Sequence, residues 1–195
     1  STHYKLGHYE KAQGLFERCY QLSCQVHGEE DPSTLKTLGN LAVIYIALEN
    51  HTKAAALLEE SYRLHCKVHG EQHPDTLNEL SNLADCYCQL ENYEKAIQTG
   101  NKAYDLTCQV LGKDHPDSLV CLGNLALTYH KMGSYAKAAE LEEYVWHQRC
   151  KLLGEAHPDT LQALSNYALT LDHQGSFEKA AELGEQAYVL NKNVI

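Results

Sequence analysis

The sequence predicts an all-α fold in which antiparallel helix hairpins stack into a solenoid. Three observations support this fold class. The chain repeats itself every 42 residues without insertion or deletion, apolar residues within each repeat recur at steps of three and four, and short links separate the apolar runs. A single helical hairpin cannot bury its apolar stripe alone, so neighbouring hairpins must supply the partner surface.

The 42-residue period appears at positions of several residue types. The glycines are Gly28, Gly70, Gly112 and Gly154, the prolines Pro32, Pro74, Pro116 and Pro158, the asparagines Asn40, Asn82, Asn124 and Asn166, and the alanines Ala42, Ala84, Ala126 and Ala168. More than four copies in register exclude chance. We therefore predict one domain over residues 1–195, with a half repeat at 1–28 and full repeats at about 29–70, 71–112, 113–154 and 155–195.

The second repeat shows the two helices of one hairpin. The first is predicted from about Pro74 to Leu90 and the second from about Tyr93 to Leu111, with only two residues between them. Gly112 follows the last apolar position, where a residue that adopts a left-handed conformation at low cost ends a helix. We expect Ala84 and Ala96 to lie where helices approach most closely, so that leucine at either position overpacks the contact.

The tripeptide His73-Pro74-Asp75 resembles a catalytic fragment, because an imidazole lies two residues from a carboxylate. It recurs as His115-Pro116-Asp117 and His157-Pro158-Asp159, but the first copy reads Asp31-Pro32-Ser33. Proline is favoured at the first helical position, and an aspartate after it lies near the positive end of the helix dipole. We interpret the tripeptide as the start of each first helix.

The two ends of the sequence indicate a piece of a longer protein. Residues 4–12, "YKLGHYEKA", match the end of a first helix, its turn and the start of a second helix, so the sequence begins in the middle of a repeat. Neither end shows the distinct polar cap that terminal repeats carry.

Charge and composition exclude several classes of partner. A formal net charge of −10 disfavours binding to nucleic acid or to anionic lipid, which both attract clustered Lys and Arg. No apolar run approaches the roughly 18 to 20 residues that cross a bilayer, so no membrane association is expected. The eight cysteines fall inside helical patterns rather than in loops, which favours reduced thiols and a cytoplasmic location.

The sequence contains only weak indications of a disulfide, metal or catalytic site. Cys24, Cys66, Cys108 and Cys150 repeat at 42, but equivalent residues of stacked hairpins lie too far apart for a disulfide, so we interpret them as buried, small and apolar. His65 and His69 have the i, i+4 spacing of zinc ligands without a third ligand, and are interpreted as two histidines on a partly exposed helix. We predict no enzyme, no metal site, no cofactor and no small-molecule substrate.

Residues 82–96, "NLADCYCQLENYEKA", resemble the tetratricopeptide repeat. The long period, together with "LGKDHPDSLVCLGNLALTY" at residues 111–129, is similar to the variant found in kinesin light chains and nephrocystin-type proteins. This resemblance implies a right-handed α-solenoid, a tetratricopeptide superhelix of four full repeats and a leading half repeat. It also implies a concave groove, lined by the first helices, that binds a peptide segment of a protein partner.

The resemblance carries the peptide-contacting role to the asparagines Asn40, Asn82, Asn124 and Asn166. Their amides can both donate to and accept from a peptide backbone, although they could instead bond neighbouring helix backbones. The flanking positions expected in the groove are Lys36, Gly39, Val43 and Ile46; Asn78, Ser81, Asp85, Cys88 and Gln89; Val120, Gly123, Leu127, His130 and Lys131; and Gln162, Ser165, Leu169, Asp172 and His173. The small residues Gly39, Ser81, Gly123 and Ser165 leave room for a ligand.

The leading hypothesis is an adaptor or scaffold whose groove captures a peptide. Only Lys36 and Lys131 supply cations there, offset by Asp85 and Asp172, which argues against a clamp for a terminal carboxylate and against acidic peptides. We expect a neutral or apolar segment with a basic flank. The alternative is a structural or regulatory array that packs against other domains of its own chain or self-associates.

Overall fold

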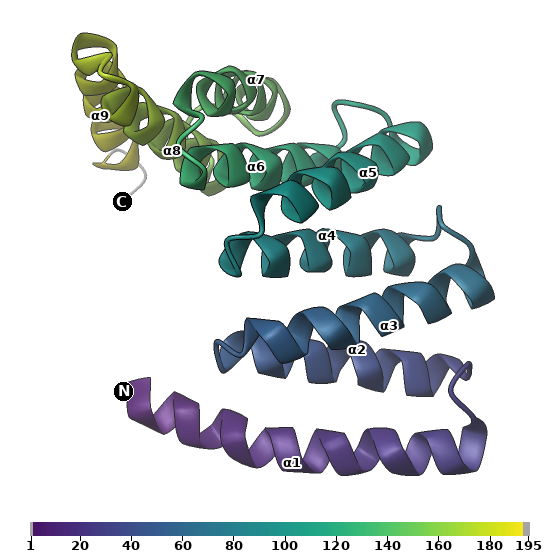
Figure 1. The fold of residues 1–195 in the computed structure, drawn as a ribbon. Coiled ribbons are helices and arrows are strands. Elements are labelled where there is room, and N and C mark those ends of the chain that lie inside the picture. Colours follow the sequence, from purple (N-terminus) through teal and green to yellow (C-terminus); the bar gives the residue numbers. More distant parts are fainter. Residues whose placement is uncertain (1, 193–195) are drawn as a thin grey trace. The chain divides into compact units, whose positions relative to one another are not determined.

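A computed structural model describes the backbone of residues 2–192 and the side chains of residues 11–192 (Figure 1). Within this part of the chain the secondary structure is entirely helical, which confirms the predicted all-α fold class. The helices are α1 (Thr2–His27), α2 (Pro32–Ala47), α3 (His51–His69), α4 (Pro74–Gln89), α5 (Tyr93–Leu111), α6 (Pro116–Lys131), α7 (Tyr135–Leu153), α8 (Pro158–Gln174) and α9 (Phe177–Lys192).

The helix boundaries follow the repeat. The predicted first helix of the second repeat ends one residue early, at Gln89, and the predicted second helix has the observed bounds of α5. The glycines that follow the second helices have φ of 88° at Gly70, 92° at Gly112 and 90° at Gly154. These positive φ values, which glycine adopts at low cost, confirm glycine as the residue that ends α3, α5 and α7. The left-handed helical conformation itself is not adopted at Gly70 or Gly154, where ψ is 163° and 160°.

The His-Pro-Asp tripeptides begin the first helices, as predicted, and their histidines cap these helices. Nδ1 of His73, His115 and His157 accepts a hydrogen bond of 3.2 Å from the backbone N–H two residues later. In the divergent first copy, Oδ1 of Asp31 accepts from the N–H of Ser33 at 2.9 Å. Because Asp and His satisfy the same orphan donor, the position needs an acceptor rather than a catalytic group.

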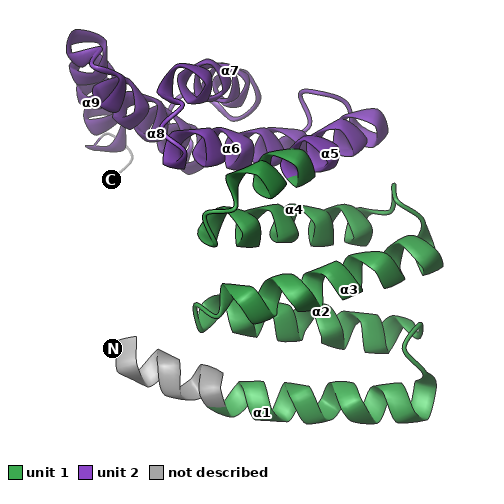
Figure 2. Cartoon of the chain, viewed as in Figure 1, with its two compact units in different colours: residues 1–99 green, residues 100–195 purple. Residues whose placement is uncertain are grey.

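Two compact units divide the chain, residues 1–99 and residues 100–195 (Figure 2). In the first unit α2 packs against α1 and α3, and α3 packs against α4; in the second, α7 packs against α6 and α8, and α8 packs against α9. Consecutive helices are thus neighbours within each unit. The alanines predicted at close contacts are buried, among them Ala84 at 7% exposed and Ala96 at 1%.

Helix α1 departs from the prediction at its start. Residues 4–12 match a helix end and a turn, but the backbone of α1 continues through them from Thr2 to His27. Only about one helical turn precedes the expected turn in this sequence, which is too short to fold back and pack, so the hydrogen bonds of a continuous helix prevail.

Two predictions of burial are wrong. The repeating cysteines Cys24, Cys66, Cys108 and Cys150 are half-buried rather than buried, and their thiols are free. His65 is buried at 5% exposed rather than lying on a partly exposed surface, and its Nδ1 lies 2.9 Å from the backbone carbonyl oxygen of Ser61. A polar residue is tolerated there because that nitrogen, as N–H, can donate to the carbonyl.

Candidate functional site

The residues predicted for the groove lie on the first helices of the hairpins, and most are exposed. The exposed members are Lys36, Asn40, Val43, Asn78, Gln89, Asn124, Leu127, Lys131, Asn166, Leu169 and His173. Ser81, Asn82 and Asp85 are half-buried. Cys88 was also expected in the groove but is only 2% exposed, because it belongs to the apolar core that packs around Tyr87 and Ala96.

In the second unit, several of these residues surround one hollow of about 190 Å³ between α6, α7 and α8. Its lining from the two first helices is Val120, Gly123, Asn124, Leu127, Gln162, Ala163 and Asn166. The structure therefore brings Asn124 and Asn166 to the same hollow. Asn166 Oδ1 accepts a hydrogen bond of 2.8 Å from Gln162 Nε2, a partner on its own helix.

The second helix α7 contributes Glu142, Val145 and Arg149 to the same hollow. Glu142 is only 6% exposed, and its Oε2 has no hydrogen-bond partner among the described residues. Burial raises the pKa of the Glu142 carboxyl, and a hydrogen bond with Thr170 partly opposes that shift. Arg149 is directed elsewhere, since its Nη1 donates to the backbone carbonyl of Asp159 at 2.9 Å.

A chain of hydrogen bonds leads from Glu142 toward His173. Thr170 Oγ1, which bonds the carboxyl, lies 2.7 Å from His130 Nδ1, and His130 Nε2 lies 3.2 Å from His173 Nδ1. If Glu142 is ionised, Thr170 donates to it and accepts from His130, whose Nε2 then accepts from His173. Burial, and then the neighbouring His173, lower the pKa of His130, which suits this neutral form.

The equivalent cleft of the first unit is filled rather than open. Glu79 of α4 extends toward Gly39 of α2, where an added Cβ would lie 2.6 Å from Glu79 Oε1. The room expected beside Gly39 is therefore occupied by a carboxylate, whereas an added Cβ at Gly123 meets no atom within 4 Å. Burial raises the pKa of Glu79, and its Oε2 also has no partner among the described residues.

Both carboxylates were missed by sequence reasoning, which considered only residue types on first-helix faces near the asparagines. Comparison of equivalent positions in the 42-residue repeats could have identified them. Glu142 stands where Leu58 stands two repeats earlier, and Glu79 stands where Ala163 stands two repeats later. A charged residue at a position that is apolar in another repeat indicates a buried charge with a special environment.

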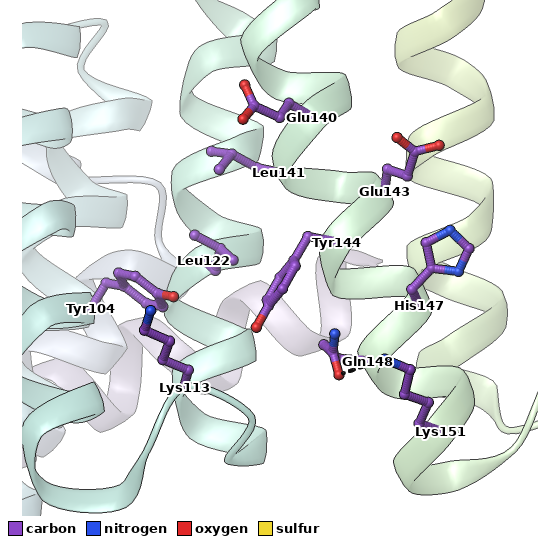
Figure 3. A pocket seen from close by; sticks show the side chains of 10 residues that line it. All are labelled: Tyr104, Lys113, Leu122, Glu140, Leu141, Glu143, Tyr144, His147, Gln148 and Lys151. Atoms are coloured by element: carbon purple, nitrogen blue, oxygen red, sulfur yellow. Dashed lines mark hydrogen bonds between the residues drawn. The ribbon is translucent and has the colours of Figure 1, made fainter.

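A larger hollow of about 800 Å³ lies on another face of the second unit, mainly along α7 (Figure 3). Figure 3 shows Tyr104 and Tyr144 facing it, with Lys113 and Lys151 at its lower edge. None of the predicted groove residues lines this hollow. Its charged groups have both signs, and one of them, Glu143, already accepts a hydrogen bond from Tyr167.

The described residues contain no group of three or more His, Cys, Asp or Glu side chains placed to hold a metal ion. Among the same residues, no helix has the length and apolar character needed to cross a membrane.

Comparisons with known proteins agree on the family of the repeats. Family models of the tetratricopeptide repeat match residues 1–67, 64–109 and 75–143, and a second model of the same repeat matches residues 151–193. No curated protein sequence matches the chain. Folds of this type are typically scaffolds for protein–protein interaction without catalytic activity.

Solved structures that resemble this chain also consist of tetratricopeptide-like repeats. Nearly identical TPR-like repeats of a kinesin light chain candidate from Podosopora anserina are 26% identical, with a TM-score of 0.83 over 96% of this chain and 89% of that one. A variant of them gives a TM-score of 0.86 at the same identity and coverage. BtubC from P. vanneervenii is 22% identical, with a TM-score of 0.85 over 97% of this chain and 76% of that one, which shows the fold alone.

Proposed function

Because the chain belongs to the tetratricopeptide repeat family, and its repeats are of the kinesin light chain type, we propose that it is an adaptor that binds a peptide segment of a protein partner along its first helices. The observation that carries this proposal is the shared hollow of Asn124 and Asn166 in the second unit. Two carboxamides that flank one hollow can hold a peptide backbone whatever its side chains.

The walls of the hollow support a segment with apolar side chains. Val120 is 46% exposed and Leu127 is 38% exposed, although both are large and apolar. Gly123 between them leaves space for a ligand, because nothing lies within 4 Å of the Cβ position. A partner that covers these side chains removes apolar surface from water, which favours binding by about 25 cal/mol per Å² buried.

An immobilised array of ten-residue peptides, neutral and basic in composition, tests the proposal with the fluorescently labelled chain. A double variant Asn124→Ala/Asn166→Ala should weaken the best peptide at least about tenfold, since two backbone hydrogen bonds are lost. The matched control is Gln148→Ala/Lys151→Ala in the larger hollow, which should leave affinity unchanged. Equal affinity of the folded asparagine variant and the parent chain would refute groove binding.

A second candidate is a structural or regulatory array that packs against other domains of its own chain or self-associates. The exposed apolar residues of α9 favour it, because Tyr188 is 69% exposed, Phe177 65% and Val189 49%. Tyr188 also lines a hollow of about 530 Å³ between α8 and α9. Sedimentation equilibrium of the parent chain and of Tyr188→Ser tests self-association; a monomer at high concentration counts against it.

A cytoplasmic location is part of the proposal. It is supported by the cysteines of the described residues, which form no disulfide and so suit a reducing compartment.

A further inference from the structure

The hollow between α6, α7 and α8 contains a buried acid without a complete set of partners. Glu142 lines it, is 6% exposed, and keeps Oε2 without a hydrogen bond among the described residues. A buried carboxylate oxygen that lacks a donor costs free energy, so a ligand that brings a donor recovers that cost. We propose that this hollow binds the side chain of a lysine from the partner segment, with Glu142 accepting hydrogen bonds from its ammonium group.

The size and the walls of the hollow fit one such side chain. Its volume of about 190 Å³ is below the roughly 300 to 1,000 Å³ of pockets for drug-sized ligands, so it suits a single residue. Val120, Leu127 and Val145 provide apolar walls for the four methylenes of lysine. The compact ammonium can then contact the Glu142 carboxylate, which belongs to the same lining.

The cation already present in the lining does not satisfy Glu142. Arg149 donates to the carbonyl of Asp159 at 2.9 Å, at the start of α8. Thr170 bonds the Glu142 carboxyl but is itself shared with His130 Nδ1 at 2.7 Å. The net charge of −10 adds long-range attraction for a basic segment.

The first unit shows the same cleft in a closed form. There Glu79 extends from the first helix toward Gly39, and Leu58 stands at the position of Glu142. In the second unit Ala163 replaces Glu79, which opens the space, and the carboxylate is contributed by α7 as Glu142 instead. These two differences, Ala163 in place of Glu79 and Glu142 in place of Leu58, leave the cleft of the second unit open to a ligand, whereas Glu79 fills the cleft of the first unit.

Two small probes test the proposal with the 195-residue chain. N-acetyl-lysine methylamide carries the ammonium, and N-acetyl-norleucine methylamide has the same aliphatic chain without the charge. Backbone amide signals of Gly123 and Ala163 should shift saturably with the lysine probe, and the norleucine probe should bind at least about tenfold more weakly. Equal shifts with both probes, or no shift with either, would overturn the proposal.

Substitutions assign the effect to one carboxylate. Glu142→Gln should abolish the preference for the lysine probe, while Glu140→Gln removes the same charge from an exposed position of α7 and should keep it. If Glu142→Gln retains the preference, the assignment to this residue fails. A second variant, Glu142→Leu/Ala163→Glu, reproduces the arrangement of the first unit and should also lose the lysine probe.

The lysine site rests on the proposed function only in that the lysine belongs to the bound segment, and the two can fail separately. If the array yields a peptide that needs Asn124 and Asn166 but tolerates norleucine at every lysine, the lysine site is wrong and groove binding stands. If the lysine probe binds through Glu142 while no peptide binds, groove binding is wrong and the lysine site stands.

Discussion

Tyr167 and Glu143 are joined by a hydrogen bond of 2.7 Å that connects α8 to α7. Lys179 of α9 donates to the same tyrosine hydroxyl at 2.6 Å, and its Nζ lies 5.1 Å from the centre of the tyrosine ring. Tyr167 is 2% exposed. One buried residue thus ties three consecutive helices of the second unit through its hydroxyl.

We expect Tyr167→Phe to lower the free energy of unfolding by about 1 kcal/mol, because it removes the hydroxyl that bonds Glu143 and Lys179. Urea denaturation at neutral pH measures the change. Tyr188→Phe is the control, since Tyr188 is 69% exposed and should change little.

The contribution of this bond should depend on pH. The Tyr167 hydrogen bond, followed by that of Lys179, lowers the pKa of Glu143 below its ordinary value of 4.5. A carboxyl with a depressed folded pKa stabilises the fold above its unfolded pKa and loses this contribution as pH falls through the folded pKa. The difference between the parent chain and Tyr167→Phe should therefore shrink as pH falls below 4.5, the ordinary value. A difference that stays constant there would contradict this role of Glu143.

Glu142→Gln should raise the midpoint of thermal unfolding at pH 7. Burial raises the pKa of this carboxyl, so its ionised form opposes folding above the folded pKa, and the penalty disappears below the unfolded pKa. The advantage of the variant should therefore fade as pH falls toward 4.5, the ordinary value. Glu140→Gln, at an exposed position, should show no such pH-dependent gain.

The turn between α4 and α5 offers a stabilising change. Glu91 has φ of 58°, in the left-handed region. The equivalent residue two repeats later is Gly175, with φ of 90°. A residue with a side chain costs roughly 1 to 2 kcal/mol in this region. Glycine removes that strain, but the greater entropy of glycine in the unfolded chain offsets part of the gain. Glu91→Gly should raise stability by up to about 1 kcal/mol, and Gly133→Glu should lower it. Urea denaturation measures both changes, and a loss of stability in Glu91→Gly or a gain in Gly133→Glu would refute the explanation.

Ala96→Leu should lower the free energy of unfolding by roughly 1 to 3 kcal/mol, because Ala96 is 1% exposed and lies in the core with Tyr87. The same change at the exposed Gln98 of the same helix is the control for helix propensity. Circular dichroism during urea titration measures both. Equal stability of the two variants would show that the alanine is not at a close contact.

The capping role of the His-Pro-Asp tripeptide predicts a difference between two substitutions of one residue. His115→Ala should cost about 1 kcal/mol because the N–H of Asp117 loses its acceptor. His115→Asp should keep most of the stability, since Asp31 already fills this position in the first repeat. Equal loss in both variants, measured by thermal unfolding, would contradict the cap.

The sequence by itself determined the elements and their order. Proline at the first helical position, an acceptor just before it, and glycine with positive φ after the second helix all act within a few residues of their own position. The apolar spacing within Pro74–Gln89 and Tyr93–Leu111 is local too. These signals need no knowledge of neighbours, and the family resemblance followed from them.

The tertiary structure decided which side chains fill the space between helices. Glu79 meets Gly39, and Glu142 meets Thr170, across adjacent hairpins. Whether a carboxylate closes a cleft or lines it depends on the residues that face it from other helices, such as Ala163. The same reason explains the buried His65 and the half-buried Cys66, because exposure is set by packing partners far along the chain and not by helical spacing.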